Sequence, residues 1–411
     1  METGALPSSA AEVEPPKPTV EKFTPFIWPS APPADCPFPL SMEFTKVRFL
    51  GVKSGFRYGD TFYPSWADDD KMYSPFTDGR TWRRDGGWDD SNSMTGGNAV
   101  TGQAVIEGDD PLTLTVYSIG LTRGPATPYQ GRYPCGSLVY NGVWYYGTYT
   151  LGPSARVVHE GVSYNWPWLG PFVGFRVSRD KGATWEDGPH TPEKNIFGET
   201  GLKGEPVKIG SPHFVDFGKN LEHSPDGKAY MVAHGSEQRL RYFSPSWITG
   251  DRVYLLRVSP SAENMNDPSK WEFYAGKDAR GQARWTSDFA QIQPLLAWDN
   301  NMGCVTVTYN APLRKYFMCV TDGGNTCEKM NTYILESDSL TGDWRLVSYM
   351  KDFGEQAYFV NIPSRFIAAD GQTMWLLYSG NFAPNWNGQQ IKANPPGSHY
   401  GLVLQKIRLE R

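Results

Sequence analysis

Short strand-like segments, each bounded by turn residues, recur along this chain from Met42 to Gln405 and constrain its fold more than any other feature. They fall into groups of four that repeat with a period of ~70 residues, which is typical of a ring of small antiparallel sheets. The first four groups are Asp60–Trp66, Lys71–Phe76, Gly102–Glu107 and Thr113–Ser118; Gly136–Tyr140, Val143–Thr150, Phe172–Ser178 and a short strand after Trp185; His213–Phe217, Ala229–His234, Arg252–Val258 and Trp271–Ala275; and Cys304–Tyr309, Tyr316–Thr321, Asn331–Ser337 and Trp344–Tyr349. The fifth group has only three segments, which are Tyr358–Phe366, Thr373–Ser379 and His399–Arg408.

The composition supports an all-β fold built from these segments. The 411 residues include 15 Trp, 22 Tyr and 21 Phe, together with 43 Gly and 33 Pro. Aromatic side chains favour strands, whereas Gly and Pro favour the tight turns that join them. Runs rich in Ala, Leu, Glu and Lys, which long helices need, are almost absent. The sequence therefore predicts an all-β domain of many short strands.

The missing fourth strand of the last group is available at the start of the domain. Phe44–Val52 reads as a strand, and a ring of sheets must be closed because an open ring would leave exposed strand edges. We therefore predict a five-bladed β-propeller over residues 41–411, in which this N-terminal strand closes the last blade. Residues 1–40 contain ten Pro and little periodicity, so we expect them to form a disordered leader.

A local motif favours a propeller independently of the strand count. Ser178–Trp185 matches the Asp-box pattern Ser-x-Asp-x-Gly-x-Thr-Trp, and weaker versions occur at Thr77–Trp82 and Thr321–Thr326. In this motif the Asp bonds to the turn backbone, the Gly takes the tight conformation and the Trp packs between sheets. The Asp of the motif is therefore expected to be structural.

Charge and cysteine content narrow the classes of partner. A formal net charge of -5 disfavours a polyphosphate partner, so we expect no nucleic acid. No apolar run approaches the ~20 residues that a membrane span needs, and we expect a monomer with no membrane partner. The start of the chain lacks the apolar core of a signal peptide. Cys319 and Cys327 flank a predicted turn, and Cys304 is expected across a hairpin from Cys319, so one disulfide is as plausible as none.

Four residues are candidates for acid–base chemistry. In a propeller, the loops that enter the innermost strands and the loops that link second to third strands meet on one face, around the axis. The catalytic candidates on that face are Asp60, Asp78, Glu355 and His213. Glycosidic cleavage usually takes two carboxyl groups ~5–10 Å apart, and blades that face each other across an axis provide such a gap. A structural role is equally natural for Asp60, Asp78 and His213, whereas Glu355 is a poor turn former.

Further side chains on this face suit the binding of a sugar. Trp faces stack on the C–H surfaces of sugar rings, and Arg and Asn bond to hydroxyl or carboxylate groups. Arg132 would neutralise an acidic sugar or else form a buried salt bridge. The candidates for substrate binding are Arg80, Arg132, Tyr133, His234, Asn301, Trp166 and Trp298. We expect no cofactor and no catalytic metal; a structural calcium is compatible with the fold, although no calcium-loop motif occurs.

Three stretches of sequence resemble a known group of proteins. Gly59–Ala67, Trp271–Gly276 and Asn301–Tyr309 resemble bacterial and fungal propellers related to the five-bladed glycosidase superfamily of arabinanases and endo-D-arabinanases. The resemblance covers most of Met42 to Arg411 as a blade pattern. It implies an extracellular carbohydrate-active enzyme with acidic catalytic residues in the axial funnel, and Asp60 looks like its blade-one acid. His213 stands in blade three where the family pattern has an acid.

Three hypotheses about function remain open at this point. The leading one is a glycoside hydrolase that cleaves a polysaccharide or oligosaccharide in the central pocket. The second is a polysaccharide lyase that acts on a uronic-acid-containing glycan, with His213, His234, Arg132 and Tyr133 as base and cationic groups. The third is a noncatalytic propeller that binds glycans.

Overall fold

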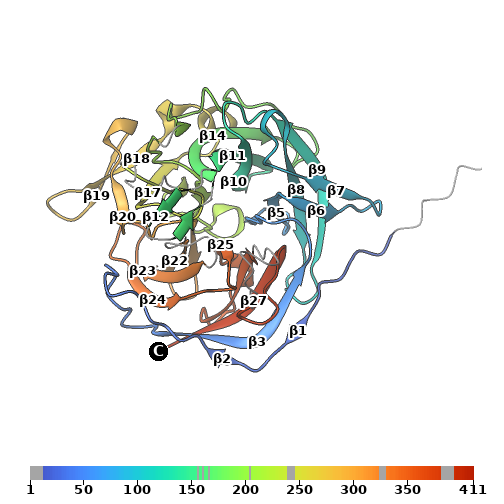
Figure 1. Ribbon diagram of the computed structural model, residues 1–411, viewed down its shortest axis with the longest axis vertical. Helices are drawn as coiled ribbons and strands as arrows, with labels where there is room; N and C mark the ends of the chain where they lie inside the picture. The colour runs from blue at the N-terminus through green and yellow to red at the C-terminus, as the bar shows by residue number, and fades with distance from the viewer. Residues whose placement is uncertain are drawn as a thin grey trace, which may run out of the picture.

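The computed structural model describes residues 13–154, 157–159, 162–164, 167–202, 205–237, 246–323, 330–380 and 393–411, and within 153–167 it describes the backbone alone. Figure 1 shows five antiparallel sheets arranged around one axis. The predicted all-β, five-bladed propeller is therefore confirmed. Among the described residues, no helix has the length and apolar character needed to cross a membrane.

Each blade begins near the axis and ends at the rim. Blade one contains β4 (Ser65–Trp66), β5 (Met72–Phe76), β8 (Ala99–Glu107) and β9 (Thr115–Gly124), with a hairpin of β6 (Gly79–Trp82) and β7 (Trp88–Ser91). Blade two contains β10 (Gly131–Tyr140), β11 (Val143–Ser154) and β14 (Pro167–Ser178), with a hairpin of β12 (Val157–His159) and β13 (Val162–Tyr164). Blade three contains β15 (His213–Phe214), β16 (Ala229–Gly235), β17 (Arg252–Val258), β18 (Glu272–Lys277) and β19 (Ala283–Thr286), with β20 (Pro294–Ala297) paired to β17.

The last two blades follow the same plan. Blade four contains β21 (Val305–Asn310), β22 (Lys315–Asp322), β23 (Asn331–Ser337) and β24 (Arg345–Met350). Blade five contains β25 (Ala357–Asn361), β26 (Thr373–Gly380), β27 (Leu402–Glu410) and β3 (Lys46–Phe56). Helical segments are short: α1 (Ala262–Met265) and the 3-10 turns η1 (Gly96–Asn98), η3 (Lys219–Leu221), η4 (Pro268–Lys270), η5 (Phe289–Gln291) and η6 (Ser364–Phe366).

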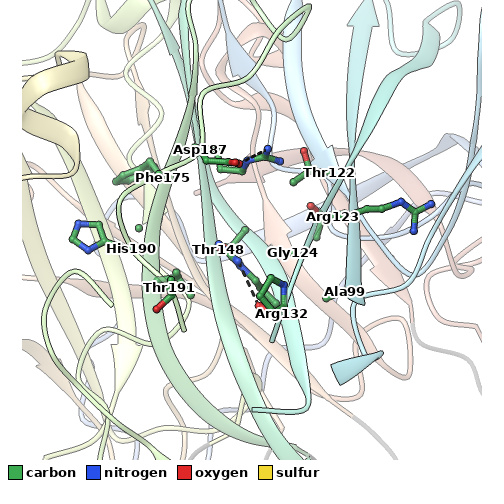
Figure 2. Close-up of a pocket in the computed structure, with 16 residues that line it drawn as sticks. Ala99, Thr122, Arg123, Gly124, Arg132, Thr148, Phe175, Asp187, His190 and Thr191 are labelled. Atoms are coloured by element: carbon green, nitrogen blue, oxygen red, sulfur yellow. Dashed lines mark hydrogen bonds and ion pairs between the residues drawn. The ribbon is translucent and has the colours of Figure 1, made fainter. Parts of the chain in front are cut away.

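Neighbouring blades bury both faces of each other's inner strands. Every residue of β16 is buried, and β22 is buried along all but its first residue. The outermost strand β3 instead alternates buried and more exposed residues along its first half. This difference follows from the ring, because inner strands are covered by a blade on each side whereas rim strands also meet solvent. Between blades one and two the packing leaves a cavity of about 270 Å³ (Figure 2).

The ring is closed as predicted, by a strand from the start of the domain. β3 pairs with β27 from Lys46↔Glu410 to Phe56↔Leu402, and Arg48 donates to the Glu410 carboxylate at 2.5 Å through Nε. The free edge of β3 is covered in turn by β1 (Glu21–Lys22) and β2 (Phe26–Ile27), which lie within the segment expected to be a leader. Figure 1 shows this segment running along the outside of β3. Covering the edge removes a template for pairing with another chain.

Some local predictions differ from the structure. Thr77–Trp82, which we interpreted as a weak Asp-box, instead provides the strand β6 of a hairpin. The short strand expected after Trp185 is reduced to one bridge between Val177 and Glu186. Cys304 and Cys319 are free thiols, so no disulfide joins them; Cys327 lies outside the described residues. The Cys304 thiol instead donates a hydrogen bond from Sγ to the Trp247 carbonyl at 2.7 Å.

The full motif at Ser178–Trp185 forms a tight turn held by Asp180. The Asp180 carboxylate accepts from the Thr184 backbone N–H at 2.8 Å and from the Thr184 hydroxyl at 2.6 Å. These bonds hold the pKa of Asp180 down at about 2. Gly182 takes the φ of +99° that the turn requires, and Trp185 packs 5.3 Å from Trp144. The Asp180 carboxylate thus bonds within its own turn.

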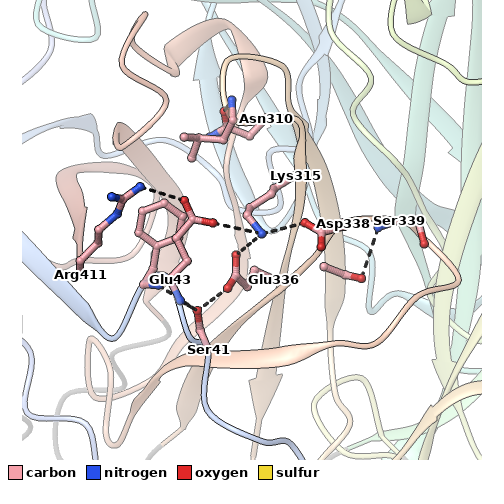
Figure 3. Close-up of polar contacts among 11 residues, drawn as sticks. Ser41, Glu43, Asn310, Lys315, Glu336, Asp338, Ser339 and Arg411 are labelled. Atoms are coloured by element: carbon pink, nitrogen blue, oxygen red, sulfur yellow. Dashed lines mark hydrogen bonds and ion pairs between the residues drawn. The ribbon is translucent and has the colours of Figure 1, made fainter.

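A polar network joins the segment that precedes β3 to blade four (Figure 3). The Lys315 ammonium group lies 3.2 Å from Glu336, 3.3 Å from Glu43 and 2.8 Å from Asp338. The Glu336 side chain is only 3% exposed, and it also accepts a hydrogen bond from the Ser41 hydroxyl. These three carboxylates hold the pKa of Lys315 well above its usual range. Lys315 therefore fixes the segment that leads into β3.

Replacing Lys315 by Met tests this network. We expect Lys315→Met to lower the free energy of unfolding by about 2–4 kcal/mol, because it leaves the buried Glu336 carboxylate without its cation. Urea unfolding monitored by tryptophan fluorescence measures the change. The matched control is Lys17→Met, which removes an ion pair to Glu14 whose side chains are 81% and 77% exposed, so its midpoint in urea should equal that of the wild type. Equal stability of the two variants would show that the network does not anchor the segment.

Candidate active site

Two carboxyl groups of blade one, Asp60 and Asp78, meet beside the axis. Asp60 lies before β4, and its backbone pairs with Thr77, with N–H to carbonyl distances of 2.8 and 3.0 Å in the two directions. Asp78 follows Thr77 directly, after the end of β5. The pairing of these two short segments therefore brings together carboxyl groups that the sequence separates.

The backbone around this pair is held in an uncommon conformation. Thr61 and Asp78 have φ angles of +66° and +45°, in the left-handed region that residues other than glycine rarely adopt. For a β-branched residue such as Thr61 this conformation is strained, and strain of this kind clusters at functional sites. The two segments also approach closely at glycines, since a Cβ on Gly79 would lie 2.8 Å from the Cα of Gly59. The geometry of the pair is thus imposed by the surrounding fold.

The Asp60 carboxyl group is suited to hold a proton. Its side chain is 6% exposed, and burial, together with the negative charge of Asp78, raises its pKa to about 8. Tyr358 of β25 donates a hydrogen bond to Oδ2, and the Thr61 hydroxyl donates to Oδ1 at 2.9 Å. These hydroxyl donors lower the pKa, but by less than burial raises it. Burial is therefore the dominant influence on Asp60, and it favours the protonated form of this carboxyl group.

The Asp78 carboxylate lies in a more open and more polar setting. Its Oδ1 accepts from the Ser93 backbone N–H at 2.8 Å, and the Tyr133 hydroxyl also bonds to the carboxylate. Burial raises the pKa of Asp78, whereas these hydrogen bonds lower it. Tyr400, just before β27, donates to the Asp78 backbone carbonyl. Tyr residues from blades two and five thus surround a carboxyl pair from blade one.

This arrangement can perform acid–base chemistry. When two carboxyl groups interact in a poorly solvated site, their pKa values separate, so that one keeps its proton while the other is ionised. Asp60 would then be the acid, and Asp78 the ionised partner. A reaction that transfers a proton to a leaving group and develops positive charge nearby requires such a pair.

The two histidines are buried in β15 and β16 of blade three. His213 is buried with its ring 4.0 Å from the ring of Tyr63, and burial lowers its pKa to about 3. It lines a small cavity of about 40 Å³ together with Tyr63 and Asn361. His234 is also buried, its Nε2 lies 2.9 Å from the Ser246 carbonyl, and its pKa is lowered to about 4. Burial therefore favours the neutral form of both rings.

The other sequence candidates fall in several places. Glu355 is buried in the turn that leads into β25, with a φ of +64°. Arg80 lies exposed on the hairpin, 4.6 Å above the Trp88 ring. Asn301 bonds to the Asp299 carbonyl at 2.7 Å. Trp298 is 6% exposed and packs in the core, where its indole N–H donates to Asp35 at 3.1 Å.

Trp166 lies outside the described residues. Arg132 lies in the cavity between blades one and two, whereas its neighbour Tyr133 points to Asp78. Asp60, Asp78 and Tyr133 thus form one cluster in the structure. The other described candidates make the separate contacts given above.

Sequence reasoning missed Tyr358 and Tyr400, the hydroxyl donors beside Asp60. Both come from blade five, and the inner position of Tyr358 within a predicted first strand was the only available signal. Within the described part of the chain, no group of three or more His, Cys, Asp or Glu side chains could hold a metal ion.

Comparisons with known proteins give similar folds at low identity. No family model matches the chain, and no curated protein matches it. Similar solved structures include a GH43_1 enzyme from Xanthomonas citri complexed with xylotriose, at 13% identity and a TM-score of 0.45 over 86% of this chain and 88% of that one. An α-L-arabinofuranosidase from Podospora anserina in complex with cellotriose has 10% identity and a TM-score of 0.42 over 87% and 92%.

A family 117 glycoside hydrolase from the marine bacterium Zobellia galactanivorans is also similar, with 12% identity and a TM-score of 0.42 over 86% of this chain and 87% of that one. The three structures are glycoside hydrolases, and they do not specify a substrate for this chain. The five-bladed fold itself follows from the sheets of this chain.

Proposed function

We propose that this protein is a glycoside hydrolase whose catalytic carboxyl groups are Asp60 and Asp78. The observation that carries the proposal is the buried pair of carboxyl groups, in which burial and the charge of Asp78 raise the pKa of Asp60 to about 8. A glycosidase needs one protonated and one ionised carboxyl group on either side of the bond that it cleaves. The substrate would be a polysaccharide or oligosaccharide, which fits action outside the cell.

In this mechanism each carboxyl group has one task. Asp60 donates its proton to the glycosidic oxygen while the bond from that oxygen to the anomeric carbon breaks. Asp78 either takes a proton from the attacking water or attacks the anomeric carbon itself, and water supplies the new hydroxyl group in both cases. Tyr358 and Tyr133 orient the two carboxyl groups through their hydroxyl hydrogen bonds.

A lyase has less support from these residues. Elimination from a uronic acid needs a base that reaches the proton beside the sugar carboxylate. His213 and His234, which we considered for this role, are both buried, and each ring is packed or bonded within the core. Glu355 remains a further candidate acid in the hydrolase.

A panel of polysaccharides tests the proposal. Purified protein is incubated with neutral and acidic plant, fungal and bacterial glycans, and new reducing ends are measured together with the ultraviolet absorbance of unsaturated uronates. We expect reducing ends without that absorbance. The Asp60→Asn, Asp78→Asn double variant is the blank, since a contaminating hydrolase would act equally in both preparations. Absorbance that rises with the reducing ends would identify a lyase, and binding without products would identify a glycan-binding propeller.

A further inference from the structure

A second polar site lies in the cavity between blades one and two. The cavity of about 270 Å³ is lined by residues of β8 and β9 on one side and of β10, β11 and β14 on the other. Its volume is at the small end of ligand pockets, which suits a single small ligand or one sugar unit. Two arginines, Arg132 of β10 and Arg176 of β14, contribute to its wall.

The two guanidinium groups repel each other across this space. Burial, and then the positive charge of Arg176, lower the pKa of Arg132 to about 10. Arg132 donates from Nε to the Thr148 hydroxyl at 3.0 Å and from Nη1 to the Pro125 carbonyl at 3.5 Å, and both acceptors are uncharged. Two cations therefore share a partly desolvated cavity, which is unfavourable unless an anion lies between them.

The described carboxylate that faces them, Asp187, forms an ion pair with Arg176, whereas with Arg132 it has only a charge interaction, which raises the pKa of Arg132 by less than Arg176 lowers it. Asp187 accepts from Arg176 Nη2 at 2.8 Å, but its side chain is 89% exposed, so solvent screens its charge. The Nε atom of Arg176 is buried and has no hydrogen-bond partner among the described residues. Figure 2 shows Arg132 and Asp187 at the cavity, whereas Arg123 points away from it. One positive charge and a buried donor thus remain for a ligand.

The local backbone makes room for this arrangement. A Cβ on Gly124, which ends β9, would lie 2.8 Å from Nη1 of Arg132. Successive side chains of a strand point to opposite faces, and Tyr133 points to Asp78. Arg132 therefore faces the other side of β10, and the cavity is a separate site from the carboxyl pair.

We propose that this cavity binds a carboxylate group, with Arg132 and Arg176 as its ligands. The planar guanidinium fork matches a carboxylate in two-point hydrogen bonding, and the single uncompensated charge matches a monoanion. The carboxylate comes from a uronic acid unit of a glycan or from a small free acid. This proposal does not rest on the hydrolase activity, because binding is measured without turnover.

Calorimetric titration with three probes tests the proposal. Sodium glucuronate, glucose and sodium acetate are titrated into the wild-type protein at constant ionic strength. Glucuronate is expected to bind at least about tenfold more tightly than glucose, in which a hydroxymethyl group replaces the carboxylate. Tighter binding of glucuronate than of acetate identifies an acidic sugar as the source, and equal binding identifies a free acid. Equal binding of glucuronate and glucose would overturn the proposal.

Variants locate the binding in this cavity. Arg176→Met and Arg132→Met should each weaken glucuronate binding about tenfold or more, because each removes half of the guanidinium pair. Both should fold with a Tm no lower than that of the wild type, since each relieves the repulsion between the two cations. The control is Arg179→Met, which removes an exposed cation paired with Glu186. Unchanged glucuronate binding in both cavity variants would refute the assignment.

Discussion

Replacing Asp60 by Asn is expected to lower kcat about 10²–10⁴-fold while the propeller stays folded. Asn has the size of Asp and can still accept the hydrogen bond from Tyr358, but its amide group cannot protonate a glycosidic oxygen. Asp78→Asn is expected to lose at least as much, because it removes the negative charge that faces the anomeric carbon. The measurement is initial rates on whichever polysaccharide the panel identifies.

The pH dependence of stability separates lost chemistry from lost folding. The folded-state pKa of Asp60 is raised to about 8, whereas the unfolded chain ionises near ~4. Between these values the folded state binds more protons than the unfolded state, so stability falls as the pH rises through this window. Asp60→Asn lacks the titrating group. We therefore expect urea unfolding of the variant to show a weaker decline over this range, and stability equal to or above that of the wild type at its alkaline end.

An exposed aspartate of the same blade provides the control. Asp90 lies on the solvent side of the hairpin in β7, and Asp90→Asn should leave kcat unchanged. Wild-type rates in Asp60→Asn would remove Asp60 from the mechanism. A large loss in Asp90→Asn would show that the assay responds to charge on blade one in general.

The fold was predictable because its signals are local. Strands and turns leave short-range patterns, and the surplus strand at Phe44–Val52 can be assigned once the last group is seen to lack one. Asp60 and Asp78 could be placed on the same face by the same counting. The two carboxyl groups come together because Asp60 pairs with Thr77, which lies only seventeen positions further along the chain. The predicted hairpin of the first two strands of blade one already brings these two segments close together.

Contacts that depend on closure of the ring could not be predicted. Tyr358 and Tyr400 reach Asp60 and the Asp78 carbonyl over sequence separations of 298 and 322 residues. In a chain with 22 Tyr, nothing in the sequence separates a tyrosine that bonds to a carboxylate from one that packs in a blade. Trp298 shows the converse, since an indole expected to stack on sugar is buried and donates to Asp35.

The arginine cavity illustrates the same limit. Arg132 was identified from its place at the start of an inner strand. Arg176 lies in a strand of the same blade, and it meets Arg132 only through the register of β10, β11 and β14. The sequence shows that the side chains of Arg132 and Tyr133 point in opposite directions from β10. It does not show which of the two lines the cavity and which one reaches Asp78.

Replacing Gly303 by Ala is expected to destabilise the fold by about 3 kcal/mol or more. Gly303 lies before β21, and a Cβ there would stand 2.1 Å from the Thr321 carbonyl oxygen and 2.3 Å from that of Ile248. Both obstacles are backbone atoms. Thr321 is held because its N–H bonds to the Cys304 carbonyl at 2.9 Å, and Ile248 because its carbonyl accepts from Gly323 at 2.9 Å. No side-chain rotation can relieve the clash.

Thermal unfolding followed by circular dichroism measures this effect, with Gly97→Ala as the matched control. A Cβ on Gly97 would meet nothing within 4 Å, so that variant should differ from the wild type by less than about 0.5 kcal/mol. Gly303 lies where the inner strand of blade four meets the loop that carries Ile248 and Trp247. A displacement of this loop would reach Tyr358, because the Trp247 ring lies 4.8 Å from the Tyr358 ring. Gly303→Ala should therefore lower kcat as well as Tm. An equal Tm in the two variants would show that the loops near the axis can move without a loss of stability. The packing around Gly303 would then not explain the fixed geometry of the carboxyl pair.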